Sequence, residues 1–128
     1  MVRFALIFAQ LIFLAATIGQ AAAEKRVALV IGNGAYTSAS PLPNPSRDAE
    51  AIEKLFKNAG FEFVQRATDL KASAMRKALR DFSEHARTAD IAVIFYAGHG
   101  IEVGGINYLI PVDAALERLE DAFAARER

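Results

Sequence analysis

Residues 94–105 read IFYAGHGIEVGG, an apolar run that stops at a histidine with a glycine on each side. The run begins at Ile91 and contains β-branched and aromatic residues without a charge, which predicts a buried strand over residues 91–96. Ligand-binding and catalytic groups of open α/β sheets gather beyond the carboxyl ends of the strands. We therefore expect His99, three residues after Tyr96, to lie at the edge of a sheet where chemistry takes place.

The two glycines beside His99 add to this expectation. Gly98 and Gly100 predict a sharp turn of the backbone and room for a substrate to approach closely. The backbone N–H of Gly100 is also a candidate donor to a developing oxyanion. A Gly-His-Gly triplet alone equally fits a histidine with a surface or structural role.

Two apolar runs and two amphipathic segments precede this stretch. The sequence predicts strands over residues 26–31 and 61–64 and helices from Pro45 to about residue 59 and over residues 72–86. Asn44 is the expected cap of the first helix, and Gly60 its expected end. The order β-α-β-α-β is typical of an α/β fold in which right-handed crossovers join parallel strands.

The segments after His99 follow another pattern. Two short runs, 101–103 and 106–108, flank Gly104-Gly105, which predicts a hairpin whose turn residues both have positive φ. Residues 115–128 are rich in charge, with Leu116, Leu119 and Phe123 at helical spacing. We expect a charged helix or tail there.

The first 23 residues have the features of a secretory signal peptide. Arg3 provides the positive start, residues 4–18 are almost wholly apolar, and three alanines at 21–23 suit a signal peptidase. The apolar stretch is shorter than the roughly 18–20 residues that span a bilayer, which favours cleavage over an uncleaved anchor. We expect an exported protein, periplasmic or secreted, that begins at Glu24 as one small domain without a stable membrane anchor.

Composition excludes several functions. Removal of residues 1–23 leaves 14 basic residues against 15 acidic ones, mixed along the chain, so no nucleic-acid partner is expected. The chain has no cysteine and two distant histidines, so neither disulfides nor a zinc site are predicted. Gly32 and Gly34 follow a strand as in a dinucleotide fingerprint, but a loop rich in serine and proline replaces the required helix. We therefore predict no cofactor and no metal.

Four separated blocks together resemble a known family. They are RVALVIGN with Tyr36, LPNPSRDAEAIEKLFKNAGFEF, YAGHG and NYLIPVDA. In this order they are similar to the caspase-like cysteine peptidases, most closely to their bacterial metacaspase-like branch. The resemblance covers about residues 25–114 and implies that residues 24–114 form the N-terminal part of a caspase-like three-layer α/β sandwich.

The resemblance also implies an activity and its residues. His99 matches the histidine of a Cys-His dyad that hydrolyses peptide bonds in protein substrates, as the general acid and base, and Gly100 matches the residue whose N–H holds the oxyanion. In the family the nucleophilic cysteine follows a fourth strand, downstream of the segment PVD. This chain has no cysteine anywhere, and no serine or threonine from Gly100 onward. No residue is therefore assigned as nucleophile, and we expect no proteolysis by this chain alone.

Two other interpretations stay open at this point. The first is an exported, non-catalytic module that binds peptides around His99 and pairs an added strand with the open edge of residues 91–96. The second is a product that scarcely folds, because we expect three strands and two helices to bury one face of the sheet at most.

The sequence gives weaker support for a functional role of the remaining polar residues. The resemblance implies that part of the substrate is recognised in the connection before the first helix, where Arg47 is the only basic residue. Asp48 is an acid that could read a basic substrate residue, but it fits a first-turn helix acid equally well, so the preferred cleavage residue stays open. His85 suits the carboxyl end of its helix, a structural role. Asp90 and Asp113 suit turns or caps rather than a metal, and the chain shows no acid cluster for calcium.

Overall fold

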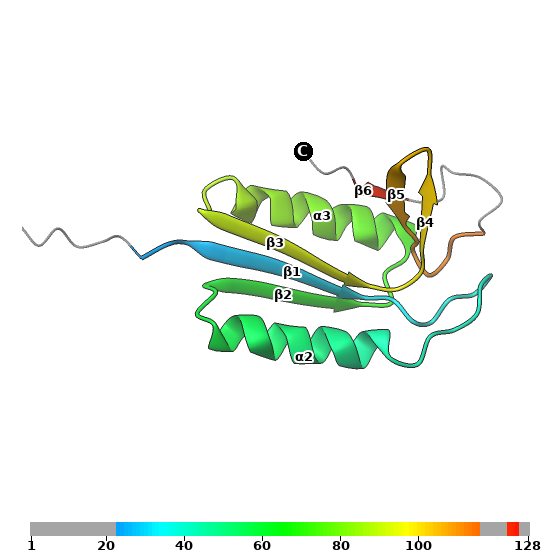
Figure 1. The fold of residues 1–128 in the computed structure, drawn as a ribbon, viewed down its shortest axis with the longest axis horizontal. Helices are drawn as coiled ribbons and strands as arrows, with labels where there is room; N and C mark the ends of the chain where they lie inside the picture. Colours follow the sequence, from blue (N-terminus) through cyan, green and yellow to red (C-terminus); the bar gives the residue numbers. More distant parts are fainter. Residues whose placement is uncertain (1–22, 116–122, 126–128) are drawn as a thin grey trace, which may run out of the picture.

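A three-stranded parallel sheet with one helix on each face organises the computed structural model, which describes residues 23–115 and 123–125 (Figure 1). The elements in chain order are β1 (Arg26–Gly32), α2 (Pro45–Asn58), β2 (Phe63–Thr68), α3 (Ala72–Ala86), β3 (Ile91–Ala97), β4 (Gly100–Val103), β5 (Ile106–Leu109) and β6 (Phe123–Ala125). The predicted α/β order is confirmed.

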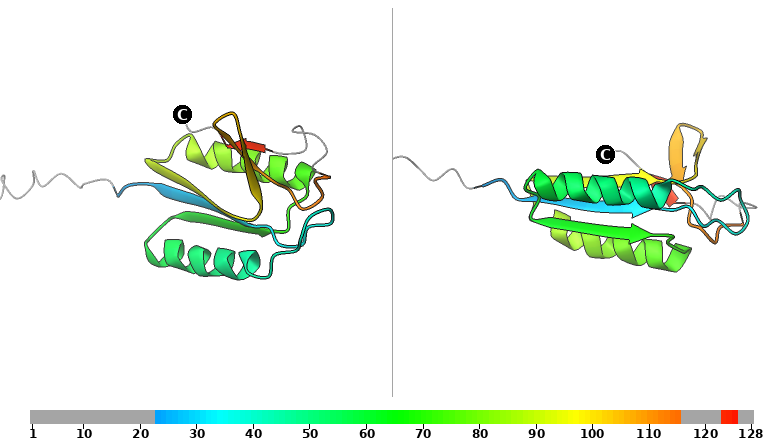
Figure 2. Two further views of the ribbon diagram at one scale, coloured as in Figure 1. Left: turned by 45° about the vertical axis from the view of Figure 1, so that its right-hand side comes forward. Right: turned by 90° about the horizontal axis from the view of Figure 1, so that it is seen from below.

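The strand order β2-β1-β3 explains why the helices lie on opposite faces. The chain moves from β1 outward to β2, and then back across β1 to β3. Because both crossovers are right-handed, reversing the direction of travel also reverses the face over which the connecting helix passes. The views in Figures 1 and 2 show α2 and α3 on either side of the sheet. The expectation that only one face would be covered was wrong for this reason.

The central strand β1 is buried on both faces, as its unbroken apolar run predicted. Val27, Leu29 and Ile31 pack with Phe82 of α3 on one face. Successive side chains of a strand point to opposite faces, so Gly32 lies on the other face, where it approaches Ala49 of α2. Each helix therefore packs on the sheet through one stripe of its surface.

The helix boundaries agree closely with the sequence prediction. Pro45 begins α2, although the side chain of Asn44 makes no capping hydrogen bond. Gly60 has φ of 78°, which ends the helix as expected. The second strand extends over Phe63–Thr68 and not over residues 61–64, so both of its predicted ends were wrong. It begins later because Phe61 packs its ring against Phe56 of α2 at a centroid distance of 4.7 Å.

The hairpin after His99 is also confirmed. Strands β4 and β5 pair antiparallel, and Gly104 and Gly105 at its turn have φ of 60° and 78°. The hairpin stands beyond the carboxyl ends of the parallel strands (Figure 2). In the segment expected to be a helix or tail, residues 123–125 form β6, a strand paired with β5. The rest of that segment after residue 115, like residues 1–22 of the signal prediction, lies outside the described residues.

Neither helix in residues 23–115 combines the length and the apolar character required to cross a membrane.

Candidate active site

The candidate site lies where the carboxyl ends of the three parallel strands meet the loop before α2. Asn33, directly after β1, is fully buried and joins three segments there. Its Nδ2 donates to the carbonyl of Ile110 at 3.3 Å, its Oδ1 accepts from the N–H of Leu70 at 2.9 Å, and its own N–H donates to the carbonyl of Ala97 at 2.8 Å. A buried amide bonded through both its nitrogen and its oxygen fixes these segments relative to one another.

Asp69 fixes the start of the loop that runs from β1 to α2. Its Oδ1 accepts hydrogen bonds from the N–H groups of Gly34 and Ala35, at 2.8 and 2.9 Å. The residue has φ of 51°, a left-handed conformation that aspartate tolerates better than most residues. The loop therefore leaves β1 in a defined direction.

This loop brings a backbone carbonyl to the ring of His99. Nε2 of the half-buried His99 lies 2.8 Å from the carbonyl oxygen of Ser40. Because a carbonyl oxygen only accepts, Nε2 must carry the proton of this hydrogen bond. In the neutral ring Nδ1 then holds the lone pair, which is the atom left to exchange a proton with a reacting group.

The main chain of His99 is held by two tyrosines. The His99 N–H donates to the hydroxyl oxygen of Tyr36 at 2.7 Å, and the hydroxyl of Tyr96 lies 2.8 Å from the His99 carbonyl. The two hydroxyls lie 3.0 Å apart, and both are also in reach of the carbonyl of Ile110, at 3.2 and 2.9 Å. The rings of Tyr36 and His99 are tilted by 54° at a centroid distance of 4.5 Å.

Burial raises the pKa of the Tyr96 phenol well above its usual value, and the hydrogen bond with Tyr36 adds to this effect. Tyr96 therefore keeps its proton throughout the physiological range. It acts at this position as a hydrogen-bond donor.

The glycines beside His99 have a different role from the expected sharp turn. Neither Gly98 nor Gly100 has positive φ. A Cβ at Gly98 would lie 2.5 Å from the Tyr96 hydroxyl and 2.6 Å from the Tyr36 hydroxyl. Gly98 thus makes room for the two hydroxyls, whereas a Cβ at Gly100 would meet only the carbonyl of Tyr108, at 3.3 Å.

The N–H of Gly100 points away from the hairpin partner. The N–H of Ile110 donates to the His99 carbonyl, which makes His99 and Ile110 a hydrogen-bonded position of the antiparallel ladder. Such positions alternate with non-hydrogen-bonded ones, so Gly100, opposite Leu109, directs its N–H away from β5. An oxyanion donor needs an N–H group that the ladder does not use, and Gly100 meets this condition on the side of β5.

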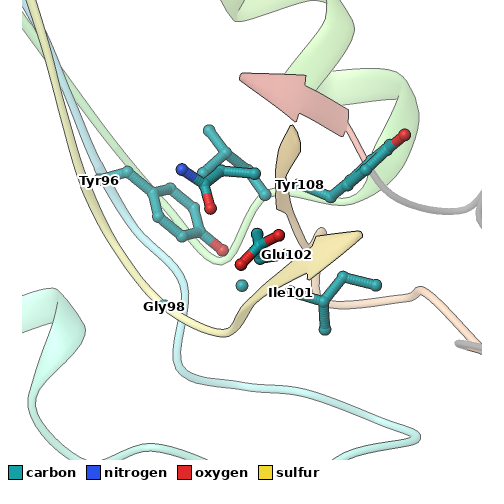
Figure 3. Close-up of a pocket in the computed structure, with 8 residues that line it drawn as sticks. Tyr96, Gly98, Ile101, Glu102 and Tyr108 are labelled. Atoms are coloured by element: carbon teal, nitrogen blue, oxygen red, sulfur yellow. The ribbon is translucent and has the colours of Figure 1, made fainter. Parts of the chain in front are cut away.

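A cavity of about 520 Å³ lies next to these two glycines, between the end of β3 and the hairpin (Figure 3). Its walls include Tyr96, Gly98, Gly100, Glu102 and Asn107. His99 does not line it, because its ring lies against Tyr36 and Ser40. The imidazole is therefore not part of the wall of this cavity.

The other polar candidates have structural partners. Asp113 accepts from the N–H of Ala72 at the start of α3, and Asp90 accepts from the N–H of Lys25, as the cap and turn interpretations predicted. His85 stacks on Phe63 at 3.7 Å. Asp48 lies in the first turn of α2, next to Arg47. Residues 23–115 and 123–125 contain no cluster of three or more histidine, cysteine or acidic residues that would hold a metal ion.

The roles of four residues in this site were not predicted from the sequence: Asn33, Tyr36, Ser40 and Tyr96. A lone polar residue between two glycines after a buried strand was a usable signal for Asn33, since a buried polar group needs partners. Ser40 contacts His99 through its backbone carbonyl, and because every residue has this group, the sequence gives no signal for the contact.

With this geometry in place, comparison with known proteins identifies the family. The model of the family described as "Caspase domain" matches residues 25–127. The chain belongs to this family. The caspase-like resemblance is confirmed at this level, and the parallel sheet between two helices is the corresponding part of a caspase-like fold.

Two animal proteins are among the curated relatives to which this caspase domain is similar. The chain is 34% identical over 98 residues to human "Mucosa-associated lymphoid tissue lymphoma translocation protein 1", covering 77% of the chain and 12% of that protein. It is 34% identical over 84 residues to "Caspase-1-B" of Xenopus laevis, covering 63% of the chain and 22% of that protein. The chain thus spans less than a quarter of the length of each of these two relatives.

Proposed function

We propose that this caspase domain supplies the histidine and the oxyanion donor of a cysteine-type endopeptidase site and that a separate segment supplies the thiol. The observation that carries the proposal is the His99 ring, whose Nε2 is bound to the Ser40 carbonyl so that Nδ1 is the atom left for catalysis. The blocks YAGHG and NYLIPVDA support the bacterial metacaspase-like branch of the family. Peptides or proteins are the substrates, and this chain alone does not cleave them.

The proposed chemistry uses both residues in one cycle. A cysteine thiolate, paired with protonated His99, attacks the peptide carbonyl, and the N–H of Gly100 donates to the resulting oxyanion. His99 then gives its proton to the leaving amine, and an acyl-enzyme forms. His99 next takes a proton from water, which attacks the acyl-enzyme; the acid leaves and the cysteine is released as thiolate beside protonated His99, as at the start of the cycle.

The open edge of β3 offers the place for the segment with the thiol. The N–H of Ile91 donates to the carbonyl oxygen of Lys25, and the carbonyl of Ala97 accepts from the backbone N–H of Asn33. The odd-numbered residues of β3 therefore direct their backbone N–H and carbonyl groups toward β1. By the alternation of a parallel ladder, Ala92, Ile94 and Tyr96 direct their N–H and carbonyl groups outward. A parallel strand added about 4.8 Å away would end beside the cavity at Gly98. A cysteine directly after that strand would lie near His99.

The coding DNA beyond codon 128 provides the first test. We expect a segment within roughly 150 residues, the scale of one more domain, that contains an apolar run followed by a cysteine. Co-expressed with this chain, it should produce peptidase activity that His99→Ala lowers by at least about 1,000-fold in kcat, because catalytic pairs act as a unit.

The purified chain alone is the negative control and should not hydrolyse fluorogenic peptides. His85→Ala is the matched histidine control, since His85 stacks on Phe63 outside the site. Hydrolysis by the chain alone, or full activity in the His99→Ala complex, would disprove the proposed roles.

We also propose that residues 1–23 direct export to the periplasm or the outside and are then removed. The apolar stretch of residues 4–18, followed by three alanines, supports this. Mass spectrometry of protein recovered from a secreting host should give an amino terminus at Glu24. Intact protein retained in the cytoplasm would contradict it.

One observation favours a second function, the binding of extended peptides without cleavage. Ile94, at the centre of the open edge, is 49% exposed although it belongs to an apolar strand. A bound peptide would add a strand here through main-chain hydrogen bonds. Ile94→Lys should then abolish binding in a fluorescence anisotropy assay, because a charged side chain on an edge strand opposes pairing.

Leu55→Lys is the matched control, since Leu55 is 56% exposed on α2 and away from the edge. Peptide binding that survives Ile94→Lys, or that Leu55→Lys removes equally, would rule out the edge of β3 as the binding site.

A further inference from the structure

Two phenol hydroxyls lie against the main chain of His99, and no step of the proposed chemistry uses them. We propose that Tyr36 and Tyr96 are positioning residues that clamp the backbone of His99 from both sides and thereby hold its ring on the Ser40 carbonyl. This inference rests on the proposed function, because it concerns the same histidine. It assigns to each tyrosine a measurable effect on the His99 ring.

The two hydroxyls contact both polar groups of the His99 backbone. The N–H donates to Tyr36 at 2.7 Å, and Tyr96 approaches the carbonyl at 2.8 Å. The N–H and the carbonyl stand on either side of the Cα, so fixing both fixes φ and ψ of His99. The direction of the Cα–Cβ bond, and with it the reach of the ring toward Ser40, is then set.

Counting protons shows which hydrogen bonds can exist together. Each hydroxyl has one proton to donate, and the carbonyls of His99 and Ile110 are the acceptors near it; each carbonyl can accept this bond beside the one it receives from an N–H group. If Tyr96 donates to His99 and Tyr36 donates to Ile110, both carbonyls are satisfied. The oxygen of Tyr36 still accepts the His99 N–H in this arrangement. No proton then lies between the two hydroxyls, but burial, the main cause of the raised pKa of Tyr96, still keeps its donated proton in place.

The clamp stands on a rigid base. Tyr36 is 6% exposed, and the carbonyl of Ile110, which both hydroxyls reach, also accepts from the buried Asn33. The hydroxyls are therefore tied to β1, β3 and the segment after β5 at once. A movement of either one would require breaking buried hydrogen bonds, which is costly.

The two sides of the clamp differ in strength. The His99 carbonyl has a second donor, the N–H of Ile110 at 3.2 Å, so it stays bonded without Tyr96. Among the described residues, the His99 N–H donates only to the hydroxyl oxygen of Tyr36. The Tyr36 ring also contacts the imidazole, with the two ring centroids 4.5 Å apart. Loss of the Tyr36 hydroxyl should therefore disturb the ring more than loss of the Tyr96 hydroxyl.

The test compares the full chain with its Tyr36→Phe and Tyr96→Phe variants by NMR. The measured quantity is the rate at which the Nε2 proton of the His99 ring exchanges with water. We expect the Nε2 proton, held by Ser40, to exchange with water roughly three- to tenfold faster in Tyr36→Phe, the range one net hydrogen bond produces. Tyr96→Phe should give a smaller increase. Tyr108→Phe is the matched control, because Tyr108 has no hydrogen bond to His99, and it should leave the exchange unchanged.

The signals of His85, which stacks on Phe63, report whether each variant keeps its fold. Unchanged His99 exchange in Tyr36→Phe with intact His85 signals would overturn the clamp, and so would an effect of Tyr96→Phe larger than that of Tyr36→Phe. If Tyr36→Phe fails to fold, the exchange of the His99 Nε2 proton is compared between Tyr96→Phe and Tyr108→Phe. Faster exchange in Tyr96→Phe supports the clamp, and equal exchange in the two variants overturns it. This test needs no thiol, so a failed peptidase reconstitution would reject the proposed function and leave the clamp standing.

Discussion

Gly32→Ala is expected to lower the free energy of unfolding by about 3 kcal/mol, at the upper end of the usual cost of overpacking a core. A Cβ at this position would lie 2.3 Å from the carbonyl oxygen of Pro45 and 2.9 Å from the Cβ of Ala49. Both belong to α2, which packs on the central strand along its length. The helix must move as a unit to admit one methyl group. Urea denaturation of the purified chain measures the loss.

Gly34→Ala provides the comparison, because it creates an equally close contact with a different kind of neighbour. Its Cβ would lie 2.4 Å from the carbonyl of Leu42, in the loop between β1 and α2. A loop moves at lower cost than a packed helix, so we expect a loss of about 1 kcal/mol. The displaced loop carries Ser40, so His99 should lose its Nε2 hydrogen bond. Equal stability losses in the two variants would contradict this account.

The sequence was sufficient to predict both helices and most of the strands in residues 23–115, because the signals for these elements are local. Apolar runs predicted β1 and β3, three-to-four spacing with Pro45 predicted α2, and Gly104-Gly105 predicted the hairpin. The start of β2 was misplaced because Phe61 satisfies strand and helix-packing patterns equally, and only its contact with Phe56 decides between them. The placement of helices on both faces follows from the strand order, which no local pattern contains.

The candidate site was predictable only in part, because its hydrogen bonds join distant residues. A histidine after a buried strand marked His99, and the family resemblance gave it a role. Tyr36 and Tyr96 are 60 positions apart, and Asn33 and Ile110 are 77 apart. Each of these residues has an ordinary local environment in the sequence. Their joint effect on His99 exists only once the strands are paired.

Gly98→Ala and Gly100→Ala should differ sharply, although both glycines flank His99. At Gly98 the added Cβ would lie within 2.6 Å of both tyrosine hydroxyls and 2.7 Å from the Cζ of Tyr96. We expect a loss of about 2–3 kcal/mol in stability, from overpacking together with disrupted buried hydrogen bonds. The His99 Nε2 proton should also exchange faster with water, because the clamp on its backbone is displaced.

At Gly100 the Cβ would come no closer than 3.3 Å to the Tyr108 carbonyl, so Gly100→Ala should cost less than about 1 kcal/mol and leave the His99 ring signals in place. Denaturation and NMR of the two variants make the comparison.

A double-mutant cycle isolates the cause of the Gly98→Ala effect. In the Tyr36→Phe background the hydroxyl 2.6 Å from the new Cβ is gone, so Gly98→Ala should cost less stability there than in the parent chain. If the stability losses of Gly98→Ala and Tyr36→Phe simply add, the space occupied by the Tyr36 hydroxyl is not the reason why glycine is needed at position 98.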